Sequence, residues 1–164
     1  MIEKKGNSSR KAVVILHNIR SVHNVGSIFR TSDAAGVGKL YLTGYTPLPI
    51  DRFGRTVKEI AKTALGAEKF VSWEHCTSVS RLITELKDKD FQIIAIEQSN
   101  KSKDYKKIRI KKKMAFIIGN EVNGLPQSIL SKTDLIAEIP MKGEKESLNV
   151  SVAFGIALYR ILGI

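Results

Sequence analysis

The sequence has little of several residue types, and each shortage excludes a class of protein. One cysteine, Cys76, in 164 residues excludes an internal disulfide and a zinc site built from several cysteines. No run of 18 apolar residues occurs, so we expect no transmembrane span. The short apolar run 12–16 has no signal-peptide cleavage site after it, which favours a cytoplasmic protein. No metal site is expected, because the histidines show no ligand spacing with acidic residues or with the cysteine; they are His17, His23 and His75.

Acidic residues are also scarce relative to basic ones. The chain has 27 Lys and Arg against 16 Asp and Glu, a formal net charge of +11. The window 101–113 holds eight basic residues and one acid, and it ends in Lys112 and Lys113. A solvated lysine-rich loop is one interpretation of this window. The charge of the whole chain favours the other, a surface for a polyanion, without distinguishing RNA, DNA and a membrane.

Short apolar runs alternate with helical patterns along the chain. The predicted strands are 12–17, 39–44, 69–73, 91–97, 114–119 and 135–140. The predicted helices are 24–36, 56–66, 77–89 and 149–162, with a short turn near 126–131. Nearly continuous apolar strands that alternate with helices predict an α/β fold, a mostly parallel six-stranded sheet with helices on both faces. Residues 1–10 are expected to form a flexible basic tail, and 11–164 a single domain.

Ligands of such sheets lie beyond the carboxyl ends of the strands, so the loops there are the first places to search. In the loop after the first strand, Asn24 is interpreted as the N-cap of the next helix, with Arg30 six residues further on. Together they are a sensible cradle for a phosphate or a ribose. The alternative is a cap and a surface salt bridge.

Two later loops carry different side chains. Gly119, Glu121 and Gly124 suggest a backbone loop folded round a ligand, or an ordinary glycine turn with an exposed carboxylate. In the loop before the last helix, Ser147 and Asn149 are plausible helix caps. Because all three loops follow strands, a single cleft is expected to collect them.

Three segments in this order resemble the SpoU/TrmH family of RNA 2′-O-ribose methyltransferases, within the SPOUT superfamily. They are NVGSIFR (24–30), GNEVNGLP (119–126) and IPMKGEKESLNVSVAFGIALY (139–159). The resemblance implies a C-terminal trefoil knot, whose loops hold the methyl donor S-adenosylmethionine and release S-adenosylhomocysteine. It also implies a homodimer, and the apolar helix 149–162 is a candidate interface if it is not a fully buried helix of a monomer.

The resemblance also implies roles for individual residues. The catalytic set would be Arg30, Asn24, Glu121, Ser147 and Asn149. The donor would contact Ile96, Gly119, Gly124, Ile139, Met141 and Leu148. The family proposal makes Arg30 the base. An arginine is not expected to lose its proton in a protein, so binding of a phosphate and the developing alkoxide is the alternative.

Substrate contacts are expected from a further loop and from the basic window. Arg52, Phe53 and Arg55 offer two cations around one aromatic ring, a set that can hold phosphates and stack a base. The alternative is a loop aromatic that packs on its own domain. Lys112 and Lys113 are the remaining candidate RNA contacts. Transfer RNA is the first candidate substrate and ribosomal RNA the second.

Two rival functions are weaker. A dinucleotide-binding domain is disfavoured, because no G-x-G-x-x-G follows the first strand. An RNA-binding module that has lost its catalysis is disfavoured too, because every member of the implied catalytic set is present.

Overall fold

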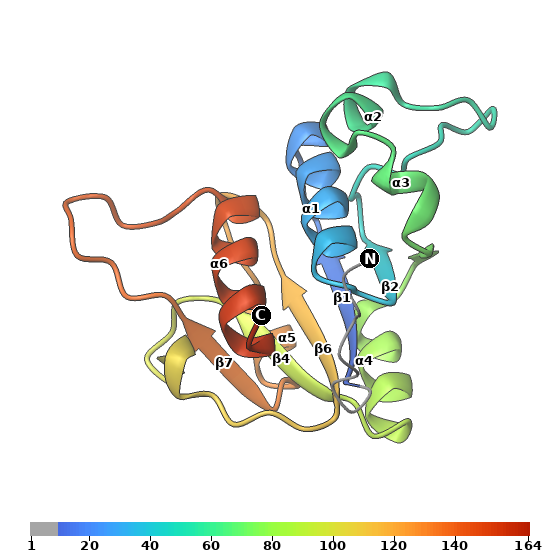
Figure 1. The fold of residues 1–164 in the computed structure, drawn as a ribbon. Coiled ribbons are helices and arrows are strands. Elements are labelled where there is room, and N and C mark those ends of the chain that lie inside the picture. The colour runs from blue at the N-terminus through green and yellow to red at the C-terminus, as the bar shows by residue number, and fades with distance from the viewer. Residues whose placement is uncertain (1–9) are drawn as a thin grey trace, which may run out of the picture.

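A parallel sheet forms the centre of the molecule (Figure 1). The computed structural model describes residues 10–164, and within them the sheet has seven strands in the order β3-β2-β1-β6-β4-β7-β5. All neighbouring strands pair in parallel. The strands are β1 (Lys11–His17), β2 (Lys39–Thr43), β3 (Trp73–Cys76), β4 (Gln92–Ile96), β5 (Lys103–Asp104), β6 (Lys113–Ile118) and β7 (Leu135–Glu138).

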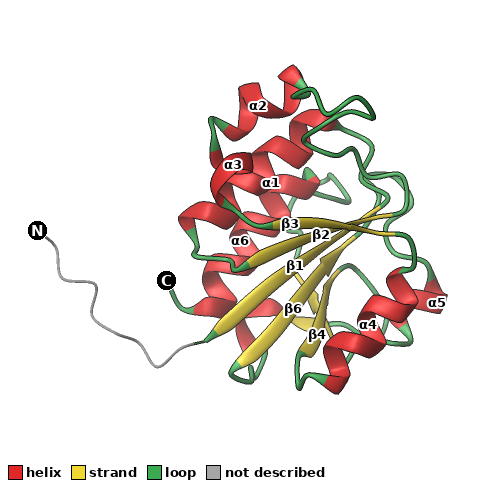
Figure 2. Cartoon of the chain, turned by 90° about the vertical axis from the view of Figure 1, so that its right-hand side faces the viewer, coloured by secondary structure: helices red, strands yellow, loops and turns green. Residues whose placement is uncertain are grey.

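Helices cover both faces of this sheet. They are α1 (Val22–Ala34), α2 (Lys58–Ala64), α3 (Ala67–Phe70), α4 (Val79–Asp88), the 3₁₀ turn η1 (Tyr105–Lys107), α5 (Gln127–Leu130) and α6 (Val150–Leu162). Figure 2 shows α4 and α5 on one side of the sheet and α1, α2, α3 and α6 on the other. The predicted α/β class, with helices on both faces, is confirmed.

The side chains of β1 explain why two faces are covered. Successive side chains of a strand point to opposite faces. Val14 and Leu16 join the core beneath α1 and α6, while Val13 and Ile15 join the core beneath α4 and α5. All four are buried, so the strand is apolar along its length instead of alternating with polar residues.

Two predictions about the strands were wrong. The sheet has a seventh strand, β5, whose two residues lie inside the lysine-rich window and carry no apolar pattern. The predicted strand 69–73 begins instead at Trp73, because residues 67–70 form the single helical turn α3. Phe70 there is 81% exposed, so an apolar side chain did not mark a buried strand.

The two ends of the described chain meet. The Arg10 guanidinium donates to the carbonyl oxygen of Leu162, at 2.7 Å, so the start of β1 is tied to the end of α6. The predicted flexible tail otherwise lies outside the described residues, and the trefoil knot stays a prediction. Within residues 10–164, no helix is long and apolar enough to cross a membrane.

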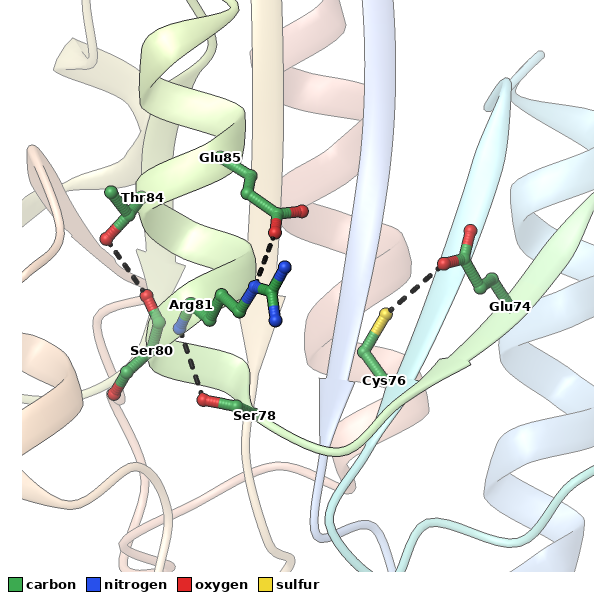
Figure 3. Close-up of polar contacts among 7 residues, drawn as sticks. All are labelled: Glu74, Cys76, Ser78, Ser80, Arg81, Thr84 and Glu85. Carbon is green, nitrogen blue, oxygen red and sulfur yellow. Dashed lines mark hydrogen bonds and ion pairs between the residues drawn. The ribbon is translucent and has the colours of Figure 1, made fainter.

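Polar contacts at the start of α4 join residues that are close in sequence (Figure 3). Ser78 caps α4 by accepting from the Arg81 backbone N–H. One turn further on, the Arg81 side chain pairs with the Glu85 carboxylate at 2.8 Å. These contacts stabilise one helix by itself and connect it to no distant loop.

Candidate functional site

A cavity of about 310 Å³ lies where the chain leaves the carboxyl ends of β4, β6 and β7. Its walls come from the loops 96–98, 119–124 and 139–150, with α6 beneath. All the predicted donor contacts line it: Ile96, Gly119, Gly124, Ile139, Met141 and Leu148. The structure therefore brings together residues that lie up to 52 positions apart in the sequence.

Glu121 joins this cavity to the start of α1. Its carboxylate lines the cavity and accepts hydrogen bonds from the backbone N–H groups of Arg20 and Ser21, at 2.9 and 3.0 Å. It also accepts from the Asn24 side-chain amide, at 3.0 Å. Three donors on one carboxylate fix the loop after β6 against the first turn of α1.

Asn24 extends the connection to α6. While its side-chain nitrogen donates to Glu121, its side-chain oxygen accepts from the Asn149 amide, at 3.2 Å. The Asn149 side-chain oxygen caps α6 by accepting from the backbone N–H groups of Ser151 and Val152. The Glu121–Asn24–Asn149 chain thus links the first turn of α1 to two loops that lie 97 and 125 positions further along the sequence.

The Glu121 carboxylate is ionised at neutral pH. Burial raises its pKa, but the hydrogen bonds from Arg20, Ser21 and Asn24 outweigh burial, and the pKa lies below its ordinary value of 4.5. Hydrogen bonds to the charged form favour that form. The cavity therefore has a fixed negative charge on its wall.

One predicted cap was wrong. Helix α1 begins at Val22, two residues before Asn24, and Ser21 is its N-cap, accepting from the Asn24 backbone N–H at 3.2 Å. Asn24 lies inside the first turn, so its side chain is available for Glu121 and Asn149. Neither of its side-chain atoms binds Arg30.

The two glycines of the second loop allow close approach of the chain to itself. A Cβ at Gly119 would lie 2.6 Å from the carbonyl carbon of Gly124. Gly124 has a φ of +63°, and a Cβ there would lie 2.4 Å from the Glu97 carboxylate. Both glycines are thus required for the fold of the loop as well as lining the cavity.

Two members of the predicted catalytic set have no internal hydrogen bond. Within the described residues, neither the Arg30 guanidinium nor the Ser147 hydroxyl has a hydrogen-bonding partner. Arg30 is exposed on α1, and Ser147 is exposed at the edge of the cavity. Both groups are accessible to a molecule that approaches from outside.

Sequence reasoning missed two residues of this site. The Glu97 carboxylate accepts from the Leu125 backbone N–H at 3.0 Å and so holds the second loop. The Gln98 side chain donates to the carbonyl oxygen of Glu146 at 2.6 Å and so holds the third. Both residues directly follow Ile96 at the end of β4, the same signal of polar residues after an apolar strand that identified the other loops.

The predicted RNA contacts fall into two places. Phe53 is 65% exposed, which excludes its packing inside its own domain. The Arg52 and Arg55 guanidinium carbons lie 4.7 and 4.9 Å from its ring centroid, as the spacing predicted. Lys112 and Lys113 lie at the amino end of β6, about 20 Å along the strand from the cavity.

Among residues 10–164, no three His, Cys, Asp or Glu side chains lie close enough together to hold an ion.

Known proteins are similar to this chain in sequence. A sequence model of the SpoU rRNA Methylase family matches residues 11–159. A Staphylococcus aureus (strain MSSA476) protein named for the TrmH family of tRNA/rRNA methyltransferases is 34% identical over 159 residues, 97% of this chain. The chain spans about 60% of the length of that relative.

Two solved structures are similar to this chain in fold, with sequence identities close to that of the Staphylococcus aureus relative. The AdoMet-bound rRNA methyltransferase of Sinorhizobium meliloti is 28% identical with a TM-score of 0.84, over 94% of this chain and 56% of that one. The A. aeolicus TrmH/SpoU tRNA modifying enzyme is 30% identical with a TM-score of 0.81, over 94% of this chain and 75% of that one.

Proposed function

The chain belongs to the SpoU rRNA Methylase family, and we propose that it transfers a methyl group from S-adenosylmethionine to a ribose 2′-OH of RNA. Transfer RNA is the first candidate substrate and ribosomal RNA the second. The observation that carries the proposal is the Glu121–Asn24–Asn149 chain, which joins the cavity to the helix that bears Arg30.

The cavity suits S-adenosylmethionine in size and chemistry. Its volume of about 310 Å³ lies in the range of small-molecule sites. Ile96, Ile139 and Leu148 supply apolar side chains for an adenine ring. Carboxylates from Glu97, Glu121 and Glu146 also line it, and they favour a cationic ligand. When bound, the donor supplies a methyl group carried on a positively charged sulfur.

Arg30 is assigned to the substrate. Its exposed guanidinium has no partner within the described residues, so it can bind an RNA phosphate and stabilise negative charge that develops on the ribose oxygen. We assign the Glu121–Asn24–Asn149 chain a positioning role. It positions the first turn of α1, and with it Arg30, relative to the cavity.

The proton of the ribose hydroxyl is assigned to a phosphate oxygen or a water molecule. An arginine is not expected to lose its proton in a protein, so the base is not assigned to Arg30. The low pKa of Glu121 makes that carboxylate a poor proton acceptor, and its oxygens are occupied by donors from α1. The Glu97 oxygens accept hydrogen bonds from the backbone N–H groups of Gln98 and Leu125, so they too are occupied.

We also infer a homodimer formed through α6. Val152, Ile156 and Tyr159 follow one face of this helix and are 49, 39 and 36% exposed, so the helix is not fully buried in one chain. A contiguous apolar stripe of this kind favours a protein partner, and a second copy satisfies it symmetrically. Sedimentation of the wild type and of Ile156→Asp tests this inference. The wild type should sediment as a dimer and the variant as a monomer, and a monomeric wild type would contradict the inference.

Calorimetric titration with S-adenosylmethionine tests the donor site. We expect about one donor bound per chain in the wild type. Leu148→Arg should lose that binding, because Leu148 lines the cavity and is 37% exposed, so the new side chain fills the cavity without disturbing the core. Gly119→Arg is a poorer choice, because any side chain there meets the Gly124 backbone.

The matched control is Leu65→Arg, the same change at a leucine that is 67% exposed and does not line this cavity. It should bind the donor like the wild type. No binding by a folded wild type at millimolar donor would contradict the enzyme proposal and favour an RNA-binding protein that retains the fold.

A further inference from the structure

A second hollow of about 480 Å³ adjoins the donor cavity. It is lined by Arg20, Tyr45, Asn120, Val122 and Asn123. The last three also line the first cavity, so the turn between Asn120 and Gly124 is a wall common to both. A molecule that lies across this turn touches both spaces.

Tyr45 is exposed but fixed in position. Its side chain is 58% exposed, yet its hydroxyl accepts from the Asn120 amide at 3.0 Å, and its backbone N–H donates to the Asn18 side chain at 3.2 Å. Asn120 is only 7% exposed, and its amide also donates to the Asn18 carbonyl oxygen. The ring is therefore held at both ends by residues that follow β1 and β6, which fixes a flat surface in solvent.

The remaining walls have unused binding groups. Val122 is 78% exposed and offers an apolar contact. Within the described residues, the side chains of Asn123 and Arg20 take part in no hydrogen bond or ion pair, and only the backbone N–H groups of these residues are bonded. An aromatic face, an amide and a guanidinium around one hollow match the base and the phosphate of a nucleotide.

We propose that this hollow binds an unpaired nucleobase of the RNA substrate, stacked on Tyr45, with Asn123 facing the base edge and Arg20 the phosphate. The proposal rests on the proposed function. Methyl transfer requires the ribose oxygen within about 3.5 Å of the methyl carbon, so the ribose has to lie at the edge of the donor cavity. The base of that nucleotide then falls on the far side of the 120–124 turn, in the second hollow.

Fluorescence anisotropy with two probes tests this assignment. One probe is a fluorescein-labelled single-stranded RNA of about ten nucleotides, and the other is a ribose–phosphate chain of the same length without bases. Saturating S-adenosylhomocysteine is included so that a base cannot occupy the donor cavity. We expect the wild type to bind the RNA more tightly than the baseless chain.

Variants then assign this preference to the ring. Tyr45→Leu should weaken binding of the RNA roughly 5- to 100-fold and leave binding of the baseless chain unchanged. Tyr45→Phe keeps the stacking face and loses only the bond to Asn120, so it should bind both probes like the wild type. The matched control is Phe70→Leu, which removes another exposed ring, one that lines neither hollow.

Three results would overturn the proposal. The first is a wild type that binds both probes equally. The second is a Tyr45→Leu variant that binds the RNA normally. The third is a Tyr45→Leu variant whose affinity falls to the same extent for both probes. Donor calorimetry on the same samples separates this failure from failure of the proposed function. Normal donor binding with no effect of Tyr45→Leu rejects only the nucleobase site, whereas absent donor binding rejects the enzyme.

Discussion

Polar contacts at the carboxyl edge of the sheet differ from those at the start of α4. In α4, the Arg81 side chain pairs with Glu85, four residues away. Ser78 caps the helix by accepting from the Arg81 backbone N–H, three residues away. At the candidate site, Asn24 bonds to Glu121 across 97 positions, and Asn149 bonds to Asn24 across 125. The first group stabilises one helix. The second group holds the first turn of α1 and two loops in one arrangement, so its loss should affect binding and catalysis as well as stability.

Glu121→Ala should give the largest effect of any single change in either region. It leaves three donors on Arg20, Ser21 and Asn24 without their acceptor. We expect the free energy of unfolding to fall by about 2 kcal/mol, because hydrogen bonds to a charged group are among the strongest. The rate of methyl transfer should fall about 100-fold or more through misplacement of α1. Urea unfolding and transfer of labelled methyl groups measure the two effects.

Glu85→Ala is the control, since it also removes a carboxylate that pairs with a neighbour. Its methyl-transfer rate should equal that of the wild type. A Glu121→Ala variant that keeps full activity would contradict the assignment of a positioning role.

Acid should abolish the contribution of Glu121 to stability. Its pKa is lower in the folded protein than the ordinary 4.5, so the folded state favours the ionised carboxylate. The contribution is complete above about pH 4.5 and is lost as the pH falls through the lower, folded-state pKa. The difference in unfolding free energy between wild type and Glu121→Gln should therefore be constant near neutral pH and shrink below about pH 4.5. A difference that grows in acid would show the opposite pKa shift.

Asn149→Ala and Ser78→Ala compare two helix caps directly. Each removes the side-chain acceptor of one helix, α6 or α4, and each should lower the free energy of unfolding by about 1 kcal/mol. Only Asn149 also bonds to Asn24, so only Asn149→Ala should slow methyl transfer. Equal slowing by both variants would mean that stability, and not the link between loops, controls the rate.

Arg81→Ala should give the smallest effect. The Arg81 side chain is 81% exposed and pairs with Glu85 one turn away, a contact worth about 0.4 kcal/mol. Donor binding and methyl transfer should not change. Thermal unfolding in low and high salt checks this, since the wild type should approach the variant as salt screens the pair.

The same contrast explains how much the sequence could predict. Polar residues directly after apolar strands identified the three loops, and all the predicted donor contacts line one cavity. The pairing of Asn24 with Glu121 and Asn149 could not be predicted, because spacing in the sequence holds no information on contacts between distant loops. Asn24 was instead interpreted as a cap, since Ser21 and Asn24 are equally good capping residues.

The wrong predictions about the strands had similar causes. Strand β5 is two residues long and charged, so it lacks any apolar alternation, and its pairing with β7 depends on tertiary structure. Around residue 70, apolar side chains predicted a strand where the chain forms one helical turn with Phe70 exposed. The long central strands were predicted correctly because burial on both faces leaves a continuous apolar run.

The most direct test of the central claim is alkaline hydrolysis of RNA that the protein has methylated with labelled S-adenosylmethionine. The RNA comes from cells that lack this chain, and Arg30→Ala is run in parallel. A 2′-O-methyl group blocks cleavage at its own nucleotide, so we expect the label in alkali-resistant dinucleotides and little label with Arg30→Ala. Label in mononucleotides would mean that a base is methylated, and it would contradict the assignment of the ribose hydroxyl as the acceptor.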